Sequence, residues 1–140
     1  LTKFGSFKLF VYKNLIDETE HLVLVKGKIK KNKSILVRMH SLNIISDLLD
    51  LKNKDLEKSI EIISKNDSGV IVIVRNPDKE MKKKNSTLSK NKNYILKEYG
   101  VGAQILLDLG VKKIILLTRS SKNIVGIDGF GLEIHGTKKI

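Results

Sequence analysis

Several residue types are scarce or missing in this chain of 140 residues. It has no cysteine, which excludes disulfides, thiolate zinc sites and cysteine nucleophiles. No apolar run approaches the ~18 residues that a membrane-spanning helix needs, and no signal peptide opens the sequence. We therefore expect a cytoplasmic protein with no membrane partner. Because the first residue is Leu1 rather than Met, we also expect a piece of a longer chain.

Acidic residues are few as well, since 15 Asp and Glu stand against 27 Lys and Arg, which gives a formal net charge of +12. Only Arg38, Arg75 and Arg119 are arginines, and Ala103 is the single alanine. Lys, Ile and Asn have A/T-rich codons, whereas Arg and Ala have G/C-rich ones, so codon bias accounts for much of the lysine excess. The charge favours solubility over a dedicated nucleic-acid surface, and we do not expect a nucleic-acid partner.

Enough apolar residues remain, 41% of the chain, to build one core. Short β-branched runs dominate the first forty residues and indicate a meander or small barrel, and later runs alternate between helical and strand periodicity. We predict one α/β (mixed α+β) domain over 1–140, with a β-rich N-terminal half followed by strand–helix–strand crossover units. The expected strands are 7–11, 21–27, 35–39, 70–74, 112–118 and 129–134, and the expected helices are 55–63 and 99–109, the latter closed by Gly110.

Residues 77–93 interrupt this periodicity with one Met and one Leu among charged and polar residues. Such a segment buries too little apolar surface to offset its ordering entropy, so we predict a mobile loop. Its lysines provide one alternative function for the chain, a polyanion-binding module. They are Lys79, Lys82, Lys83, Lys84, Lys90 and Lys92.

The residues most capable of chemistry are Arg38, His40 and Ser41, which end a predicted strand, where open sheets often place ligands. Together they could hold a phosphate or polarise a carbonyl group. The alternative is a strand-end turn with solvated polar side chains. His21 and His135 lie in strand-like runs and are interpreted as ordinary core or edge histidines.

A second candidate segment is Thr118–Lys122, which follows a predicted buried strand. Its hydroxyls and backbone amides, with Arg119 and Lys122, suit an anion. A serine-rich helix cap explains the same residues equally well.

Several segments, in the right order, resemble the GTP cyclohydrolase II family of riboflavin biosynthesis. The most specific are Tyr99-Gly-Val-Gly-Ala-Gln-Ile-Leu106 and the downstream Leu116-Leu-Thr118. The others are Gly5-Ser-Phe7, 21–27, Leu36-Val-Arg-Met-His-Ser41, 67–75, Leu109-Gly-Val111 and 125–134. The resemblance implies the family's fold. It also implies a catalytic zinc held by three cysteines, and in many bacteria a preceding 3,4-dihydroxy-2-butanone 4-phosphate synthase.

This chain departs from the family at the residues that carry its chemistry. The stretch that should lead into the first zinc-binding cysteine reads His40-Ser-Leu-Asn43, and no cysteine follows. Ile95 and Lys97 stand where the family has catalytic Asp and Arg, and an Ile cannot accept a proton. We therefore expect a degenerate member without a zinc cofactor. The resemblance leaves Arg38, His40, Ser41, Thr118 and Lys122 as nucleotide- or phosphate-binding candidates.

The leading hypothesis is a catalytically inactive domain with a structural or regulatory role for an attached 3,4-dihydroxy-2-butanone 4-phosphate synthase, pairing as a homodimer. The alternative is a zinc-independent enzyme or sensor that binds a nucleotide or a phosphate. The polyanion-binding module is the third.

Overall fold

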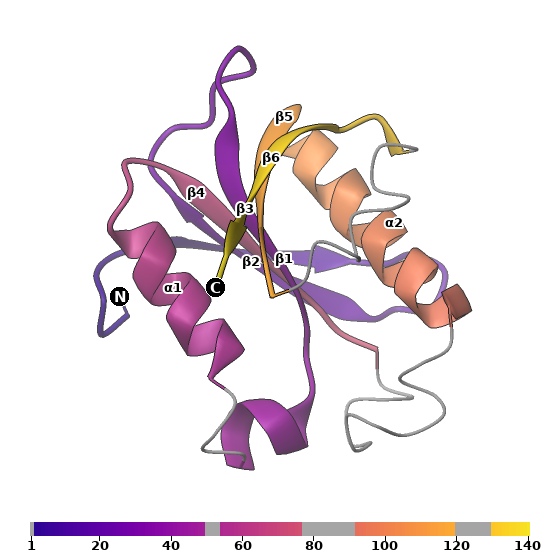
Figure 1. Ribbon diagram of the computed structural model, residues 1–140. Helices are drawn as coiled ribbons and strands as arrows, with labels where there is room; N and C mark the ends of the chain where they lie inside the picture. The colour runs from indigo at the N-terminus through magenta and orange to yellow at the C-terminus, as the bar shows by residue number, and fades with distance from the viewer. Residues whose placement is uncertain (1, 50–53, 77–91, 120–129) are drawn as a thin grey trace.

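A mixed sheet of six strands forms the centre of the computed structural model, which describes residues 2–49, 54–76, 92–119 and 130–140 (Figure 1). The strands lie in the order β1-β2-β4-β3-β5-β6. Two longer helices and one short helical turn, η1, accompany them. The elements are β1 (Lys8–Lys13), β2 (Glu20–Lys26), β3 (Ile35–Ser41), η1 (Ile45–Leu49), α1 (Asp55–Ser64), β4 (Gly69–Val74), α2 (Lys92–Asp108), β5 (Lys113–Thr118) and β6 (Glu133–Lys139).

The direction of the strands divides the sheet into two parts. β1 and β2 pair antiparallel and β2 pairs antiparallel with β4, whereas β4, β3, β5 and β6 are parallel neighbours. Helix α1 connects β3 to β4 and α2 lies between β4 and β5 in the sequence, as parallel pairing requires. The predicted α/β domain with crossover units is thus confirmed. The predicted meander or small barrel is wrong, because β4 lies between β2 and β3 in one sheet whose outer strands are β1 and β6.

Alternation along the strands gives the sheet two buried faces. In β4, Val70, Val72 and Val74 belong to the core beneath α2, while Ile71 and Ile73 belong to the core beneath α1. All six residues of β4 are buried, as is typical of a parallel strand covered on both faces. Figure 1 shows the two helices on either side of the sheet.

Helix α1 buries a stripe of Asp55, Ser59 and Ile63, each one turn after the last. The apolar residues Leu56 and Ile60 flank that stripe and pack, partly buried, against the same core. The helix was therefore predicted correctly, but its most buried line includes two polar residues.

Helix α2 ends as its sequence predicted. Gly110 has a φ of +87°, and its N–H donates to the carbonyl of Leu107 at 3.0 Å. The N–H of Val111 donates to the carbonyl of Leu106 at 2.9 Å, which completes a Schellman motif. At its other end the helix begins at Lys92, so the loop expected over 77–93 is wrong for its last two residues. Residues 77–91 lie outside the described part of the chain.

The closing strand starts later than expected, at Glu133 rather than Gly129. Leu132 is 3% exposed, and Phe130 packs against the core beneath α2. Gly131, with a φ of +92°, turns the chain between them. These apolar residues were read as part of a strand, but they pack into the core ahead of it.

Candidate functional site

Polar side chains gather where the parallel strands β3 and β5 end. β3 contributes Arg38 and His40, and Arg119 directly follows β5. Asp55 opens helix α1, and Asp47 lies in η1. The carboxyl ends of parallel strands are the usual position for ligands in open α/β sheets. This is the candidate site.

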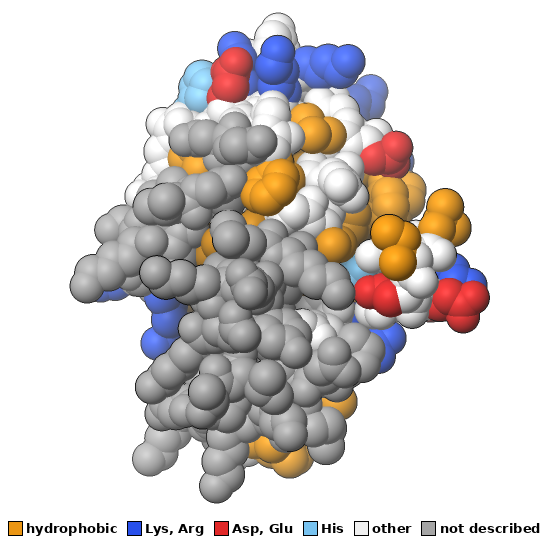
Figure 2. Space-filling model, turned by 90° about the vertical axis from the view of Figure 1, so that its right-hand side faces the viewer, with side chains coloured by type: hydrophobic (Ala, Val, Ile, Leu, Met, Phe, Trp, Pro, Cys, Tyr) orange, Lys and Arg blue, Asp and Glu red, His pale blue; other side chains and the backbone are white. Residues whose placement is uncertain are grey.

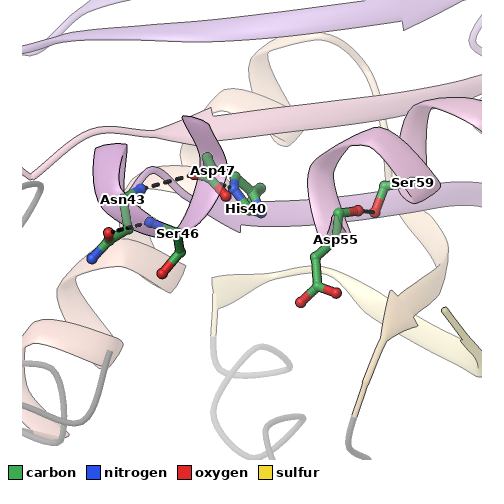
Figure 3. Close-up of polar contacts among 6 residues, drawn as sticks. All are labelled: His40, Asn43, Ser46, Asp47, Asp55 and Ser59. Atoms are coloured by element: carbon green, nitrogen blue, oxygen red, sulfur yellow. Dashed lines mark hydrogen bonds and ion pairs between the residues drawn. The ribbon is translucent and has the colours of Figure 1, made fainter. Parts of the chain in front are cut away.

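His40 and Asp47 form the most buried polar pair of the site. His40 Nε2 lies 2.8 Å from Asp47 Oδ2, and the two side chains are 6% and 7% exposed. The same carboxylate oxygen accepts the backbone N–H of Asn43 at 2.9 Å, and Asn43 Oδ1 accepts the N–H of Ser46 at 3.0 Å (Figure 3). The segment that follows β3 is therefore fixed to the sheet by its own hydrogen bonds.

Arg38 is largely enclosed but sparsely bonded. Its Nη1 donates to the carbonyl of Leu117 in β5 at 3.3 Å, a long hydrogen bond. Its Nε is buried without a hydrogen-bond partner among the described residues. Burial lowers the pKa of Arg38 below its usual value, while the Asp55 carboxylate opposes that shift. A buried guanidinium with an unmet donor favours an anionic ligand.

Asp55 and Arg119 connect helix α1 to the end of β5. Arg119 Nε donates to Asp55 Oδ1 at 2.6 Å, and its terminal nitrogen lies equally close to the same oxygen. The Asp55 side chain is 7% exposed and that of Arg119 is 53% exposed. In Figure 3 the Asp55 carboxylate points away from Ser59, whose hydroxyl donates instead to the Asp55 backbone carbonyl at 2.6 Å. The opposite charges of Asp55 and Arg119 cancel at this border of the site, and the exposed Arg119 side chain is accessible to solvent.

The structure brings together only some of the predicted site residues. Arg38 and His40 share the face of β3 that carries α1, because Leu36 two residues earlier belongs to that core. By the same alternation, Ser41 and Thr118 lie at the strand ends on the side of α2. Thr118 is buried, and Ser41 is partly exposed.

Other predicted site residues fall where side chains are not described. Ile95 and Lys97 lie in the first turns of α2, and only their backbone is described. Lys122 and the lysines at 79, 82, 83, 84 and 90 lie outside the described residues, so their proposed roles stay predictions. In Figure 2, Lys and Arg side chains gather at the top of the face in view.

The histidines outside the site were interpreted correctly. His21 is 3% exposed, and its Nδ1 accepts the backbone N–H of Arg75 at 3.0 Å, so it is a core histidine. His135 lies in β6, the last strand of the sheet, with its Nε2 3.2 Å from a carboxylate oxygen of Glu133.

Sequence reasoning missed two members of the site, Asp47 and Asp55. Asp55 was seen only as the start of a helix, where acidic residues are common for electrostatic reasons. Its partner Arg119 is 64 residues away, and no local pattern links the two. Asp47 follows His40 by seven residues in a stretch without clear periodicity.

The site does not suit the zinc ion that the resemblance implies. His40 Nε2 and Asp47 bond to each other, and Asn43 Oδ1 is taken by Ser46. His40 Nδ1 is buried without a hydrogen-bond partner in the described part of the chain, so one imidazole nitrogen remains. Across residues 2–49, 54–76, 92–119 and 130–140, no three His, Asp or Glu side chains come close enough to hold a metal. With no thiolate in the sequence, the residues present do not fit zinc.

Comparisons with known proteins agree on one family. The family model described as GTP cyclohydrolase II matches residues 1–139. Monofunctional riboflavin biosynthesis protein RIBA 2 of Arabidopsis thaliana is 36% identical over 96% of this chain and 31% of its own length. Riboflavin biosynthesis protein RibBA of Synechocystis is 34% identical over 95% of the chain and 28% of its own length. RibBA of Aquifex aeolicus is 33% identical over 95% of the chain and 38% of its own length.

The chain thus spans about a third of the length of the curated relatives it matches. In the described residues, no helix has both the length and the apolar character needed to cross a bilayer.

Proposed function

Because the chain belongs to the GTP cyclohydrolase II family of riboflavin biosynthesis, we propose that it is a non-catalytic member of that family. Its role is structural or regulatory, exerted on a 3,4-dihydroxy-2-butanone 4-phosphate synthase to which it is attached, in the cytoplasm. The absence of cysteine carries this proposal. Without thiolates the family's metal cannot be held in its usual way, and metal activation of water is the step that the chemistry depends on.

The arrangement of the remaining polar groups supports the same conclusion. His40 Nε2 is paired with the Asp47 carboxylate, which also accepts the N–H of Asn43, and Asn43 Oδ1 accepts the N–H of Ser46. A catalytic carboxylate or imidazole must reach the substrate, and this pair is turned inward and buried. These residues therefore stabilise the fold instead of acting on a ligand.

Retention of the core is the second line of support. β4 is buried along its whole length, and α2 keeps its glycine-terminated end. Core lesions typically cost several kcal/mol each, so a chain that drifted freely would lose its fold along with its chemistry. A preserved fold without the family's catalytic residues is expected of a domain kept for its structure.

The direct test is GTP turnover by the purified protein, with and without added zinc. We expect neither formate nor pyrophosphate above the no-protein blank. A cysteine-containing family member, assayed in parallel with and without a chelator, shows that the assay detects zinc-dependent turnover. Release of formate in proportion to protein concentration would contradict the proposal.

The structural role has its own test in the longer protein. Deleting residues 1–140 should lower the melting temperature or change the oligomeric state of the attached synthase. Unchanged stability, assembly and synthase activity in the shortened protein would refute a structural or regulatory role.

One observation favours a second function, binding of a nucleotide or a phosphate without zinc. The Nε–H of Arg38 is buried with no acceptor among the described residues, and Arg119 lies nearby. A bound anion raises the melting temperature by mass action. GTP and inorganic phosphate should each be tested at millimolar concentration on the native chain, on Arg38→Gln and on Lys65→Gln, an exposed control at the residue that follows α1. Binding requires a shift that Arg38→Gln abolishes and Lys65→Gln keeps; equal responses in all three proteins exclude it.

A further inference from the structure

Lysines line the edge of the sheet that lies opposite the candidate site. The parallel strands β3, β5 and β6 begin at this edge, and the turn 27–34 projects from it (Figure 1). Figure 2 shows Lys and Arg side chains gathered at the same end of the molecule. Seven lysines at this edge, which we call the lysine row, are exposed except for the half-buried Lys113. They are Lys8, Lys28, Lys30, Lys31, Lys33, Lys112 and Lys113.

The topology of the sheet arranges these lysines in a line. Lys8 begins β1 and pairs with Val25 near the end of β2. The turn 27–34 connects β2 to β3 and therefore crosses the start of β4, which lies between those strands. Lys112 precedes β5 and Lys113 begins it. From β1 to β5 the sheet has four strand spacings of about 4.8 Å, so the lysine row is roughly 19 Å long.

The backbone of the projecting turn is fixed to the sheet. Gly27 has a φ of +72°, and a Cβ at this position would lie 2.2 Å from the carbonyl oxygen of Asp67, so glycine is required where the turn leaves β2. Ile29 is partly buried against the core beneath α2. The N–H of Lys33 donates to the carbonyl of Lys30 at 3.2 Å. The turn thus presents its charges from a preorganised backbone.

Few carboxylates oppose the charge of the lysine row. Within the described part of the chain, no ion pair joins one of these lysines to an acid. Glu133 begins β6 at the same edge, and its hydrogen bond with His135, together with the charges of Lys112 and Lys113, lowers the pKa of Glu133. Asp67 is a second acid at this edge. The row therefore keeps a positive charge that ions from outside the protein must balance.

The residue types of the lysine row indicate the chemistry of its ligand. The turn 27–34 contains neither Arg nor an aromatic residue, and none of the exposed large apolar residues lies in it or at the start of β5. Protein partners are usually held by aromatic residues and Arg, membranes by apolar side chains that insert, and nucleobases by aromatic stacking. Lysines alone bind phosphate as point charges. At a rise of ~3.4 Å per phosphate, roughly 19 Å covers about five phosphates of one nucleic-acid strand.

Codon bias accounts for the number of lysines in the chain but not for their positions. Four of the eight residues of the turn 27–34 are lysines, whereas the turn 14–19 carries the acids Asp17 and Glu18. The composition therefore argued against a nucleic-acid partner without the observation that matters here, which is that the charges are aligned along one edge.

We propose that the lysine row binds a linear chain of phosphates through charge alone, without recognising bases. A nucleic-acid backbone and inorganic polyphosphate are the two sources of this chemistry. The proposal goes beyond the proposed function and uses no residue of the candidate site, which lies at the other end of the parallel strands.

The first test is the binding of a fluorescently labelled single-stranded oligothymidylate to the native chain, measured by anisotropy at several salt concentrations. We expect the logarithm of the binding constant to fall linearly with that of the salt concentration, by about 0.7 for each phosphate contacted. At about 0.1 M salt, where charges beyond ~10 Å are screened, the double variant Lys30→Glu with Lys31→Glu should raise the dissociation constant at least about tenfold.

The matched control is the double variant Lys138→Glu with Lys139→Glu. It makes the same change in net charge at two adjacent exposed lysines, but at the end of β6 instead of the lysine row. It should leave the dissociation constant at about 0.1 M salt nearly unchanged, because screening removes the effect of distant charges. Equal melting temperatures of both double variants and the native chain establish that the fold is intact.

Competition distinguishes the sources of the phosphate chain. Unlabelled inorganic polyphosphate should displace the labelled oligothymidylate, since both present repeated phosphates to the same lysines. Tighter binding of the oligothymidylate names nucleic acid as the source and tighter binding of polyphosphate names the inorganic chain, and either result supports the inference. Failure of polyphosphate to displace the oligothymidylate would overturn binding through charge alone.

Three further results would overturn the inference as a whole. One is the absence of binding at hundred-micromolar protein in low salt. Another is an equal loss of affinity in the two double variants, which would make the effect one of net charge. The third is co-sedimentation with phosphatidylserine vesicles that requires Lys30 and Lys31 while neither phosphate chain binds, since that would assign the row to a membrane surface.

Discussion

β4 and β1 have similar lengths and similar numbers of apolar residues but opposite surroundings. β4 is buried at all six positions, whereas five of the six residues of β1 are exposed. The difference comes from their places in the sheet, since β4 lies between two strands and beneath both helices and β1 lies at the edge. The apolar content of a strand therefore sets its tendency to be extended, and its neighbours decide whether that content stabilises the domain or remains available to a partner.

The largest expected effect comes from the same truncation in each strand. Ile71→Ala in β4 should lower the free energy of unfolding by about 2–5 kcal/mol, because it leaves a cavity at a residue that is 0% exposed. Leu9→Ala in β1 should cost below about 1 kcal/mol, because Leu9 is 60% exposed. Urea unfolding at low protein concentration measures both. Similar losses at the two positions would show that β1 is buried in solution.

Two glycines show the same difference between a central strand and an edge strand in how closely the backbone is packed. A Cβ on Gly69, at the start of β4, would lie 2.5 Å from Ile63 Cγ2 and 3.2 Å from the carbonyl oxygen of Leu36. Gly69→Ala should therefore destabilise the protein by about 3 kcal/mol through overpacking. Gly136→Ala, in the edge strand β6, meets nothing within 4 Å and should be neutral or slightly stabilising. Thermal unfolding of the two variants decides the matter, and a stable Gly69→Ala protein would show that α1 can move away from the sheet.

The two ends of α1 offer the same comparison between a buried and an exposed position for ion pairs. Asp55→Asn should cost about 2 kcal/mol, because a carboxylate that is 7% exposed loses its charge-assisted bond to Arg119. Glu61→Gln, which breaks an exposed pair with Lys65, should change stability by below about 0.5 kcal/mol. Denaturant unfolding of both variants in low and in high salt distinguishes the buried pair from the exposed one. Only the Glu61–Lys65 pair should be sensitive to salt, and the reverse pattern would place Asp55 in solvent.

The smallest effect concerns the side chain that fastens β1 to α2. The Tyr12 hydroxyl donates to Asp108 Oδ2 at 2.8 Å, and burial together with this carboxylate raises the pKa of Tyr12 to about 12 from 10.0. Because the unfolded chain loses this proton first, the stabilisation is complete below pH 10 and is lost between pH 10 and 12. Tyr12 is only partly buried and its hydrogen bond to Asp108 is accessible to solvent, so the loss should be below about 1 kcal/mol. In Tyr12→Phe, the free energy of unfolding should depend less on pH between pH 10 and 12. If its slope against pH is the same as in the native chain, Tyr12 does not contribute to the pH dependence.

The sequence predicted those parts of the fold that depend on local periodicity. The buried strands at 70–74 and 112–118, the helix at 55–63 and the glycine cap at 110 all follow from residues close together in the chain. Strand order does not, since nothing local indicates that β4 lies between β2 and β3. The exposure of β1 could not be predicted from the sequence either, because it depends on where the helices pack.

The candidate site was also predictable only in part. Arg38 and His40 were recognisable from residue type and from their place at a strand end. Their surroundings were not, because Asp55 and Arg119 meet across 64 residues and because alternation sends Ser41 to the other face of the sheet. The missing cysteines were the exception, since an absent residue type excludes a metal site whatever the fold.

The position of β4 also constrains the order in which the chain can fold. β2 and β3 are joined by only the short segment from Gly27 to Ser34, and they run antiparallel to each other with β4 between them. Two such strands with a short connection would readily form a hairpin within microseconds, long before β4 arrives. A hairpin of β2 with β3 would fill the place that β4 occupies, so it is incompatible with the final strand order. Productive folding requires β2 and β3 to stay apart by the width of one strand until residues 69–74 enter.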